Sequence, residues 1–174
     1  KMANMDDYFD VVIVGTGAAG LYAPESACAV PHSSAYKAES GRERFLPCAG
    51  RHLYAAWRGR LPLLFDDTMR AGHYENNPAT VDLMIRSSNS IIRDLVRRGV
   101  RFARDDHGAL RFTREGAHSR PRILFHEDIT GHEITQTLLN EVLRCENIEL
   151  REHTTLLDFF ADASACGGVI AAGP

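Results

Sequence analysis

The sequence predicts an α/β fold: a parallel sheet with flanking helices, plus a β-hairpin. The β-branched run Val11–Val14 is typical of a short strand buried in a parallel sheet. A glycine-rich turn follows at once, at Gly15–Gly20, and leads into a small-residue helix. Further along the chain, apolar residues recur at helical spacing and then in short segments of strand length, as an α/β domain requires.

Capping and turn residues place the middle elements. Asn77 is a suitable N-cap, Pro78 suits the first helical position, and Gly99 ends the helix. Residues 100–112 alternate in polarity around a turn at 105–108, which predicts the β-hairpin.

The last third of the chain predicts one helix and then strands. Thr130 and Glu133 have the spacing of a capping box, in which each side chain satisfies a free backbone N–H group of the helix start. Apolar residues at helical spacing follow. Three strands are then expected, at Ile148–Leu150, Leu156–Phe160 and Val169–Ala171, with a turn at 163–168 between the last two.

Composition limits the class of protein. The chain has 174 residues, 44% hydrophobic and 25% charged, which suits one soluble globular domain. A net charge of −3 argues against nucleic acid as a partner. No apolar run is long enough to span a membrane, and no signal peptide is expected before Val11. The cysteines lack CxxC spacing, so neither a zinc site nor a disulfide framework is expected, and the cytoplasm is the expected location. They are Cys28, Cys48, Cys145 and Cys166.

The glycine turn has the G-x-G-x-x-G pattern of a Rossmann-like dinucleotide site. Gly15 would make the tight turn, Gly17 would let a pyrophosphate approach, and Gly20 would let helix and strand pack closely. The motif alone leaves FAD, NAD or a ligand-free turn open. The acidic residue expected about 20 residues further on would be Glu39, but it lies in a polar stretch rather than at a strand end.

A second group of charged residues lies between the hairpin and the next apolar segment: Arg114, Glu115, His118, Arg120 and Arg122. Arginine forks bind carboxylates bidentately, so a small dicarboxylate is a possible ligand. The residues alone favour a solvated basic loop with its own salt bridges. No metal is expected, because the spacing of the possible ligands matches no standard site. Those ligands are His118, His126, Glu127 and Asp128.

Three segments together resemble the L-aspartate oxidase family, within the superfamily of fumarate reductase and succinate dehydrogenase flavoproteins. They are "VVIVGTGAAGLYA", "DDTMRAGHYENNPATVDLMIRSS" and "FTREGAHSRPRILFHEDITGHEITQTLL". The resemblance covers residues 10–23 and residue 65 to near the C-terminus. The "TREGAHS" block favours L-aspartate oxidase over a fumarate reductase or succinate dehydrogenase flavoprotein, or over a non-catalytic nucleotide-binding module.

The resemblance implies FAD as cofactor and L-aspartate as substrate, oxidised to iminoaspartate by hydride transfer from Cα to flavin N5. Glu115 would help orient the substrate ammonium group. Oxygen or fumarate would reoxidise the flavin, and quinolinate synthase would take the product towards NAD. The residues implied at the FAD pyrophosphate are Gly15, Thr16, Gly17, Ala18 and Ala19, with Gly20 completing the turn. The chain would be the N-terminal part of one FAD-binding domain, without the family's capping and C-terminal helical domains.

Residues 24–64 depart from that family, which has an apolar second strand ending in Ser/Thr-Lys and then a Ser-x-x-Ala-Gln-Gly-Gly segment. Read one base later, the codons of residues 32–37 permit Ile-Leu-Leu-Leu-Thr-Lys, and those of residues 43–51 permit Ser-Asp-Ser-Tyr-Leu-Ala-Gln-Gly-Gly. A compensated frameshift is therefore one hypothesis, and a divergent insertion is the other. Without a second strand, the chain is expected to bind FAD weakly or not at all and to turn over no aspartate.

Overall fold

In the computed structural model of the chain, the residues described are 8–23, 33–36, 61–161 and 166–173. They belong to two compact units. The first unit comprises Lys1–Arg44 and Leu138–Pro174, and the second unit comprises Phe45–Thr137. In the described part of the chain, no helix is both long and apolar enough to cross a membrane.

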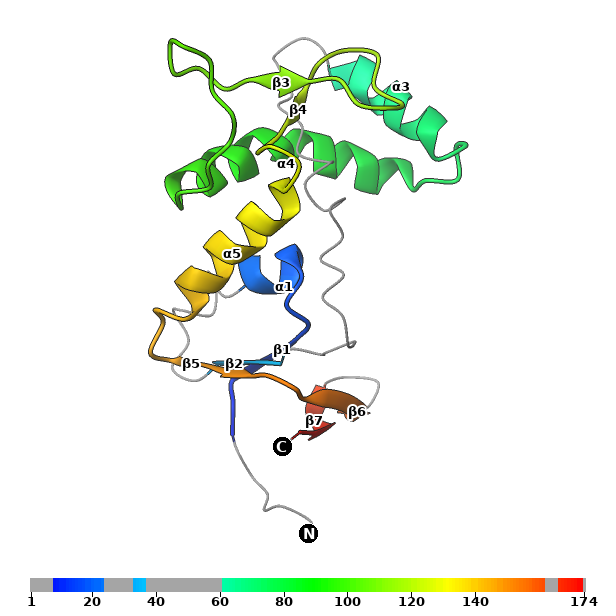
Figure 1. The fold of residues 1–174 in the computed structure, drawn as a ribbon. Coiled ribbons are helices and arrows are strands. Elements are labelled where there is room, and N and C mark those ends of the chain that lie inside the picture. Colours follow the sequence, from blue (N-terminus) through cyan, green and yellow to red (C-terminus); the bar gives the residue numbers. More distant parts are fainter. Residues whose placement is uncertain (1–7, 24–32, 37–60, 162–165, 174) are drawn as a thin grey trace. The chain divides into compact units, whose positions relative to one another are not determined.

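The first unit contains a three-stranded parallel sheet in the order β1-β2-β5 (Figure 1). β1 is Val11–Val14, β2 is Ser33–Tyr36 and β5 is Ile148–Arg151. The register pairs Val12 with Ser34, and Ser34 in turn with Glu149. The strands expected at the positions of β1 and β5 are thereby confirmed.

β2 corrects the expectation that residues 24–64 contain no second strand, and it removes the reason given for expecting weak or no FAD binding. Ladder hydrogen bonds join backbone groups, so a segment without an apolar pattern pairs when partners are available on both sides. β2 has both, because β1 and β5 flank it. The expectation that β1 is buried is wrong at its ends: Val11 and Val14 are exposed, and β1 lies at the edge of this sheet.

The first unit also contains a separate antiparallel pair, β6 (Thr155–Ala161) and β7 (Cys166–Ala172). The two strands expected here are confirmed, and both are longer than the sequence indicated. Their register runs from Thr155 opposite Ala172 to Ala161 opposite Cys166, with two irregularities along β6.

The second unit is built on two helices, α3 (Leu61–Ala71) and α4 (Pro78–Arg97). They pack together over an apolar core with β4 (Ile123–Leu124). Its buried members are Leu64, Met69, Val81, Ile85 and Ile123. Leu64 is the last residue of the stretch that departs from the family, yet its side chain is only 2% exposed. The start of α3, which lies within that stretch, therefore already contributes to the apolar core.

Both predicted ends of α4 are confirmed. The Asn77 side chain accepts hydrogen bonds from the amides of Ala79 at 3.0 Å and Thr80 at 3.2 Å. At the other end Gly99 has a φ of +99°, and its amide donates to the carbonyl of Val96. The next amide, that of Val100, donates back into the last turn of the helix, which is the Schellman arrangement that favours glycine.

The hairpin prediction is right at its turn and wrong in its strands. Gly108 donates to the Asp105 carbonyl at 2.9 Å, and a single antiparallel bridge joins Arg104 and Leu110. Residues 100–102 form no strand. Instead β3 (Phe112–Thr113) pairs with β4, so the second half of the expected hairpin finds its partner further along the chain.

The predicted capping box at the start of α5 (Thr130–Val142) is also wrong. The Thr130 hydroxyl accepts from the amide of His126, and the Glu133 carboxylate binds Arg101. An arginine offers a charge-assisted, bidentate partner, which competes successfully with a local backbone amide for the glutamate.

We expect Asn77→Ala to lower the free energy of unfolding by about 1 kcal/mol, because two amides at the start of α4 lose their acceptor. Urea unfolding followed by circular dichroism measures the change. Asn77→Ser is the matched control, since serine also caps, and it should stay close to the parent. An equal loss in both variants would contradict the assigned cap.

Candidate functional site

The turn between β1 and α1 (Ala18–Tyr22) depends on its glycines. Gly15 has a φ of +100°, in the left-handed region that favours glycine. A Cβ atom at Gly20 would collide with the carbonyl oxygen of Gly15, so the helix can approach the turn only without a side chain there. Gly17 differs, because a Cβ atom placed on it would meet nothing within 4 Å. The open space above Gly17 is the approach that a phosphate would need.

The start of α1 offers hydrogen-bond donors. Gly17 is the N-cap and supplies no side-chain hydrogen bond, and the first turn holds no acidic residue. The first intrahelical bond runs from the amide of Leu21 to the carbonyl of Gly17 at 3.0 Å. The amides before Leu21 have no intrahelical acceptor, and the helix dipole adds partial positive charge. This small, uncharged cradle fits a pyrophosphate group.

The segment between β3 and β4 carries the second group of candidate residues. It is closed at its base, where the Arg122 amide donates to the Thr113 carbonyl at 3.1 Å. Inside it, the amide of His118 donates to the carbonyl of Glu115 at 3.1 Å and makes a turn. Glu115 is half-buried, whereas the neighbouring Arg114 is exposed, as is Arg120.

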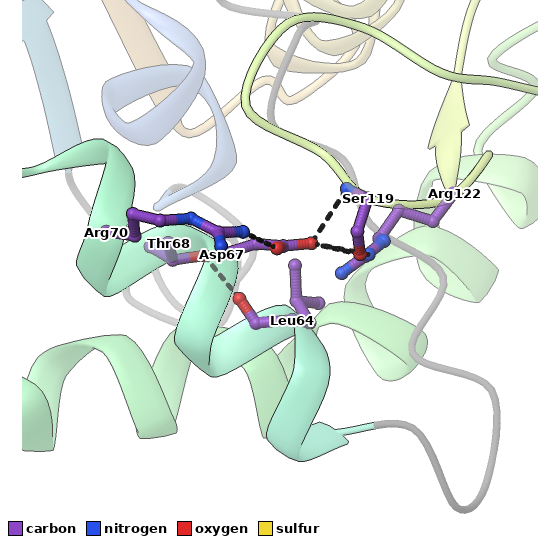
Figure 2. A network of polar contacts seen from close by, with 6 residues as sticks. All are labelled: Leu64, Asp67, Thr68, Arg70, Ser119 and Arg122. Atoms are coloured by element: carbon purple, nitrogen blue, oxygen red, sulfur yellow. Dashed lines mark hydrogen bonds and ion pairs between the residues drawn. The ribbon is translucent and has the colours of Figure 1, made fainter.

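A buried carboxylate on α3 holds this segment (Figure 2). Asp67 is 1% exposed and accepts hydrogen bonds from the Ser119 amide at 2.9 Å and the Ser119 hydroxyl at 2.6 Å. The same oxygen accepts from Nη2 of Arg122 at 2.7 Å, and Arg122 is itself buried. The other oxygen accepts from Arg70 at 2.5 Å. Both carboxylate oxygens are therefore satisfied by charged or polar donors.

These contacts decide the charge of Asp67. Burial by itself would raise the pKa of this carboxyl group, because it disfavours the charged form. The two hydrogen bonds from Ser119 and the positive charge of Arg122 act in the opposite direction and together outweigh burial. The pKa of Asp67 therefore lies below its ordinary value, and the group is ionised at neutral pH.

Arg122 is thus an internal ion-pair partner, not an exposed cation available to a ligand. The sequence favoured a solvated loop with salt bridges of its own, whereas Arg122 is buried and forms its salt bridge with Asp67 on α3. Sequence reasoning missed Asp67, although a signal was present: three residues after the buried Leu64, it lies on the same face of α3. A carboxylate on the buried face of a helix requires a donor, and the segment that follows β3 supplies it.

A second buried carboxylate, Glu133 on α5, binds Arg101. It accepts from the Arg101 amide at 2.9 Å and from Nε and Nη2 of that side chain at 3.0 Å each. The hydrogen bonds from the Arg101 side chain are the main reason that the pKa of Glu133 lies below its ordinary value, against the effect of burial. Nε2 of His126 lies 3.9 Å from the same carboxylate.

The possible metal ligands are not gathered into one site. Within the described ranges, no group of three or more His, Cys, Asp or Glu side chains could hold a metal ion. His126 faces Glu133 instead, and the Cys145 thiol donates to the carbonyl of Glu141 at 3.5 Å. Glu39, considered above as a ribose ligand, lies outside the described residues, as do Cys28 and Cys48.

Comparison with known proteins identifies the class. Residues 58–174 match the family model described as FAD binding domain, which covers more than half of the chain. The chain therefore belongs to this family of flavoproteins, whose cofactor is FAD. The FAD assignment made from the sequence is confirmed at the level of the family.

The relatives found include several L-aspartate oxidases. That of Clostridium acetobutylicum is 35% identical over 163 residues, which cover 93% of this chain and 38% of the relative. That of Clostridium perfringens is 34% identical over 167 residues, 92% of this chain and 37% of the relative. The resemblance to this family is confirmed, and the chain spans less than two-fifths of the length of these two relatives.

A solved structure, a mutated form of E. coli quinol fumarate reductase FrdA, superposes with a TM-score of 0.83 at 24% identity. The match covers 94% of this chain and 29% of the other. It shows that the chain has the fold of an FAD-binding flavoprotein.

We expect Asp67→Asn to lower the free energy of unfolding by about 3 kcal/mol at pH 7, because Arg122 is left buried without its counter-charge. Chemical denaturation measures the loss. Asp66→Asn is the matched control: it removes the same charge from the exposed neighbouring position and should change little.

The pH dependence should have a definite sign. Because the folded-state pKa of Asp67 is lowered, its contribution is complete above the unfolded pKa of about 3.9 and is lost as the pH falls through the folded value. The difference in the free energy of unfolding between the parent and Asp67→Asn should become smaller below about pH 4. A gap that widened on acidification would contradict the ionised, hydrogen-bonded carboxylate.

Proposed function

We propose that the chain is the N-terminal, FAD-binding part of an L-aspartate oxidase. The observation that carries the proposal is its 35% identity to an enzyme of that name over 93% of the chain. FAD binding alone would suit many oxidoreductases. The "TREGAHS" block, residues 113–119, adds the family-specific signal within that match.

The proposed cofactor site is the glycine turn of a Rossmann-like domain. The amides of Thr16 to Ala19 would bind the pyrophosphate of FAD, Gly17 would leave it room, and Gly20 would keep α1 against the turn. The geometry supports this, since the open side of the turn lies at Gly17 and the closed side at Gly20. When bound, the flavin would supply the acceptor for a hydride.

The proposed substrate is L-aspartate. Glu115 would accept hydrogen bonds from its ammonium group and orient Cα, and the cationic residues of the same segment would favour a dicarboxylate. Loss of a hydride from Cα and a proton from nitrogen yields iminoaspartate. Oxygen or fumarate is the proposed final electron acceptor, and quinolinate synthase the proposed consumer of the product. The cytoplasm is the proposed location, on the cysteine spacing described above.

The leading alternative is a flavoprotein of the fumarate reductase or succinate dehydrogenase type. The fold match to E. coli fumarate reductase is close, but at 24% identity it speaks for the fold alone. A non-catalytic nucleotide-binding module would share the glycine turn but would need no "TREGAHS" block. Identity to L-aspartate oxidases therefore favours the first proposal.

We also propose that residues 24–64 contain the frame-shifted stretch. One observation supports this: β2, at Ser33–Tyr36, lies inside the segment whose shifted codons permit Ile-Leu-Leu-Leu-Thr-Lys, an apolar strand like the one expected of the family. Residues 43–51, which would regain the Ala-Gln-Gly-Gly motif, lie outside the described residues. The nucleotide sequence decides the matter: codons there that cannot encode Ala-Gln-Gly-Gly in the shifted frame would exclude a frameshift.

We expect Gly17→Ala to weaken FAD binding at least about tenfold, or ~1.4 kcal/mol, while leaving the fold intact. The added methyl group would stand in the space proposed for the pyrophosphate and touches nothing in the protein. Flavin fluorescence quenching measures the affinity. Gly116→Ala is the matched control, because its Cβ atom also meets nothing. Equal affinities in both variants, or no binding by the parent, would contradict the proposed site.

The substrate is tested in a full-length protein: Clostridium acetobutylicum L-aspartate oxidase in which residues 61–137 of this chain replace the aligned segment. We expect the hybrid to oxidise L-aspartate, and Glu115→Gln in it to raise KM about tenfold, since a neutral amide attracts an ammonium group less strongly. Glu75→Gln, at an exposed position, is the control. A flavin-loaded hybrid that reduces fumarate but does not oxidise L-aspartate would favour the alternative.

A further inference from the structure

We propose that Asp67 is a positioning residue: it holds the segment between β3 and β4, which carries Glu115, in a single conformation. The inference rests on the proposed function for the role of Glu115, but the geometry that carries it is independent of that role. Asp67 lies outside the "TREGAHS" block, on α3, and fixes that block in place.

The segment is attached at its base and in its middle. At the base, Thr113 pairs with Ile123, as part of the β3–β4 ladder. Beyond that pairing the chain leaves the ladder and turns back at Glu115 to His118. Asp67 provides the middle attachment at Ser119, the residue directly after this turn.

The two hydrogen bonds from Ser119 to Asp67 fix both the backbone direction and the side-chain rotamer of Ser119. The Ser119 amide sets the direction of the backbone, and its hydroxyl sets the side-chain rotamer, both against the same oxygen of Asp67. Nη2 of Arg122 donates to that oxygen and, at 2.8 Å, to the Ser119 hydroxyl. The three side chains form a closed triangle of hydrogen bonds, in which displacing Ser119 breaks bonds to both partners. Figure 2 shows Ser119 and Arg122 next to each other at the Asp67 carboxylate.

Asp67 is itself held firmly. Its neighbours on α3, Leu64 and Met69, are buried members of the apolar core, and α3 packs on α4. The second carboxylate oxygen is occupied by Arg70, whose side chain is 64% exposed. The hydrogen bonds of Asp67 therefore connect the segment to the helix that carries two members of this apolar core.

A buried ion pair usually stabilises a protein no more than apolar residues of the same size would. The desolvation of two charges offsets most of their attraction, and well-packed apolar residues often serve as well. What apolar residues cannot provide is an acceptor for the Ser119 amide and hydroxyl. This difference separates a positioning role from a merely structural one.

The test uses the 174-residue chain and the double variant Asp67→Leu/Arg122→Met, which replaces the pair with apolar side chains of similar size. We expect its urea midpoint to stay near that of the parent, while the amides of His118 and Ser119 exchange with deuterium at least tenfold faster. Asp66→Leu is the matched control and should leave that exchange unchanged. Ser119→Ala keeps the Asp67–Arg122 ion pair and the Ser119 amide bond, and loses the two hydrogen bonds of the hydroxyl, to Asp67 and from Arg122. It should also accelerate exchange, and it decides the matter if the double variant does not fold.

Unchanged protection of these two amides in the folded double variant would overturn the proposal, as would unchanged protection in Ser119→Ala if that variant alone folds. A spectroscopic readout accompanies exchange: the Ser119 amide proton resonance should move with pH as Asp67 titrates in the parent, and should not do so in Asp67→Leu/Arg122→Met. Both readouts follow the backbone and not turnover. Negative results in both would therefore rule out the positioning role of Asp67 without affecting the proposed activity. Loss of L-aspartate activity in the hybrid, in turn, would not affect the proposed role of Asp67.

Discussion

The missing side chain at Gly20 is the constraint on which the first unit depends. With any Cβ atom there, the carbonyl of Gly15 would be displaced, and α1 could not start directly against the end of β1. The left-handed φ of Gly15 serves the same purpose from the other side of the turn. A chain that meets both conditions presents the start of a helix, rich in free amides, at the end of a parallel strand, which is where α/β proteins bind phosphates.

The second unit follows a different principle. Its apolar core joins α3, α4 and β4 without directional bonds, and so sets their packing but not the course of the chain between β3 and β4. The polar triangle of Asp67, Ser119 and Arg122 sets that course. The buried charge of Asp67 is tolerated because its carboxylate accepts hydrogen bonds from every donor around it. The apolar core therefore sets how the helices pack, and the polar contacts set the course of the segment between β3 and β4.

Local signals were sufficient wherever the determinant was local. Asn77 and Gly99 mark the ends of α4 because caps act within one turn, and the strand–turn–helix order predicted the glycine turn of β1 and α1. Contacts between residues far apart in the chain could not be predicted from the sequence. Glu133 bonds to Arg101, 32 residues away, instead of capping α5, and Arg122 pairs with Asp67 across 55 residues. β2 was missed for the same reason, because its partners and not its own residue types make it a strand.

We propose that β1, β2 and the glycine turn together form a site for FAD. The most direct measurement is a crystal structure of the chain grown with FAD. We expect the pyrophosphate to lie against the first amides of α1, over Gly17, with Ser33–Tyr36 paired to Val11–Val14. FAD bound away from the turn, or β1 without β2 beside it, would contradict this site.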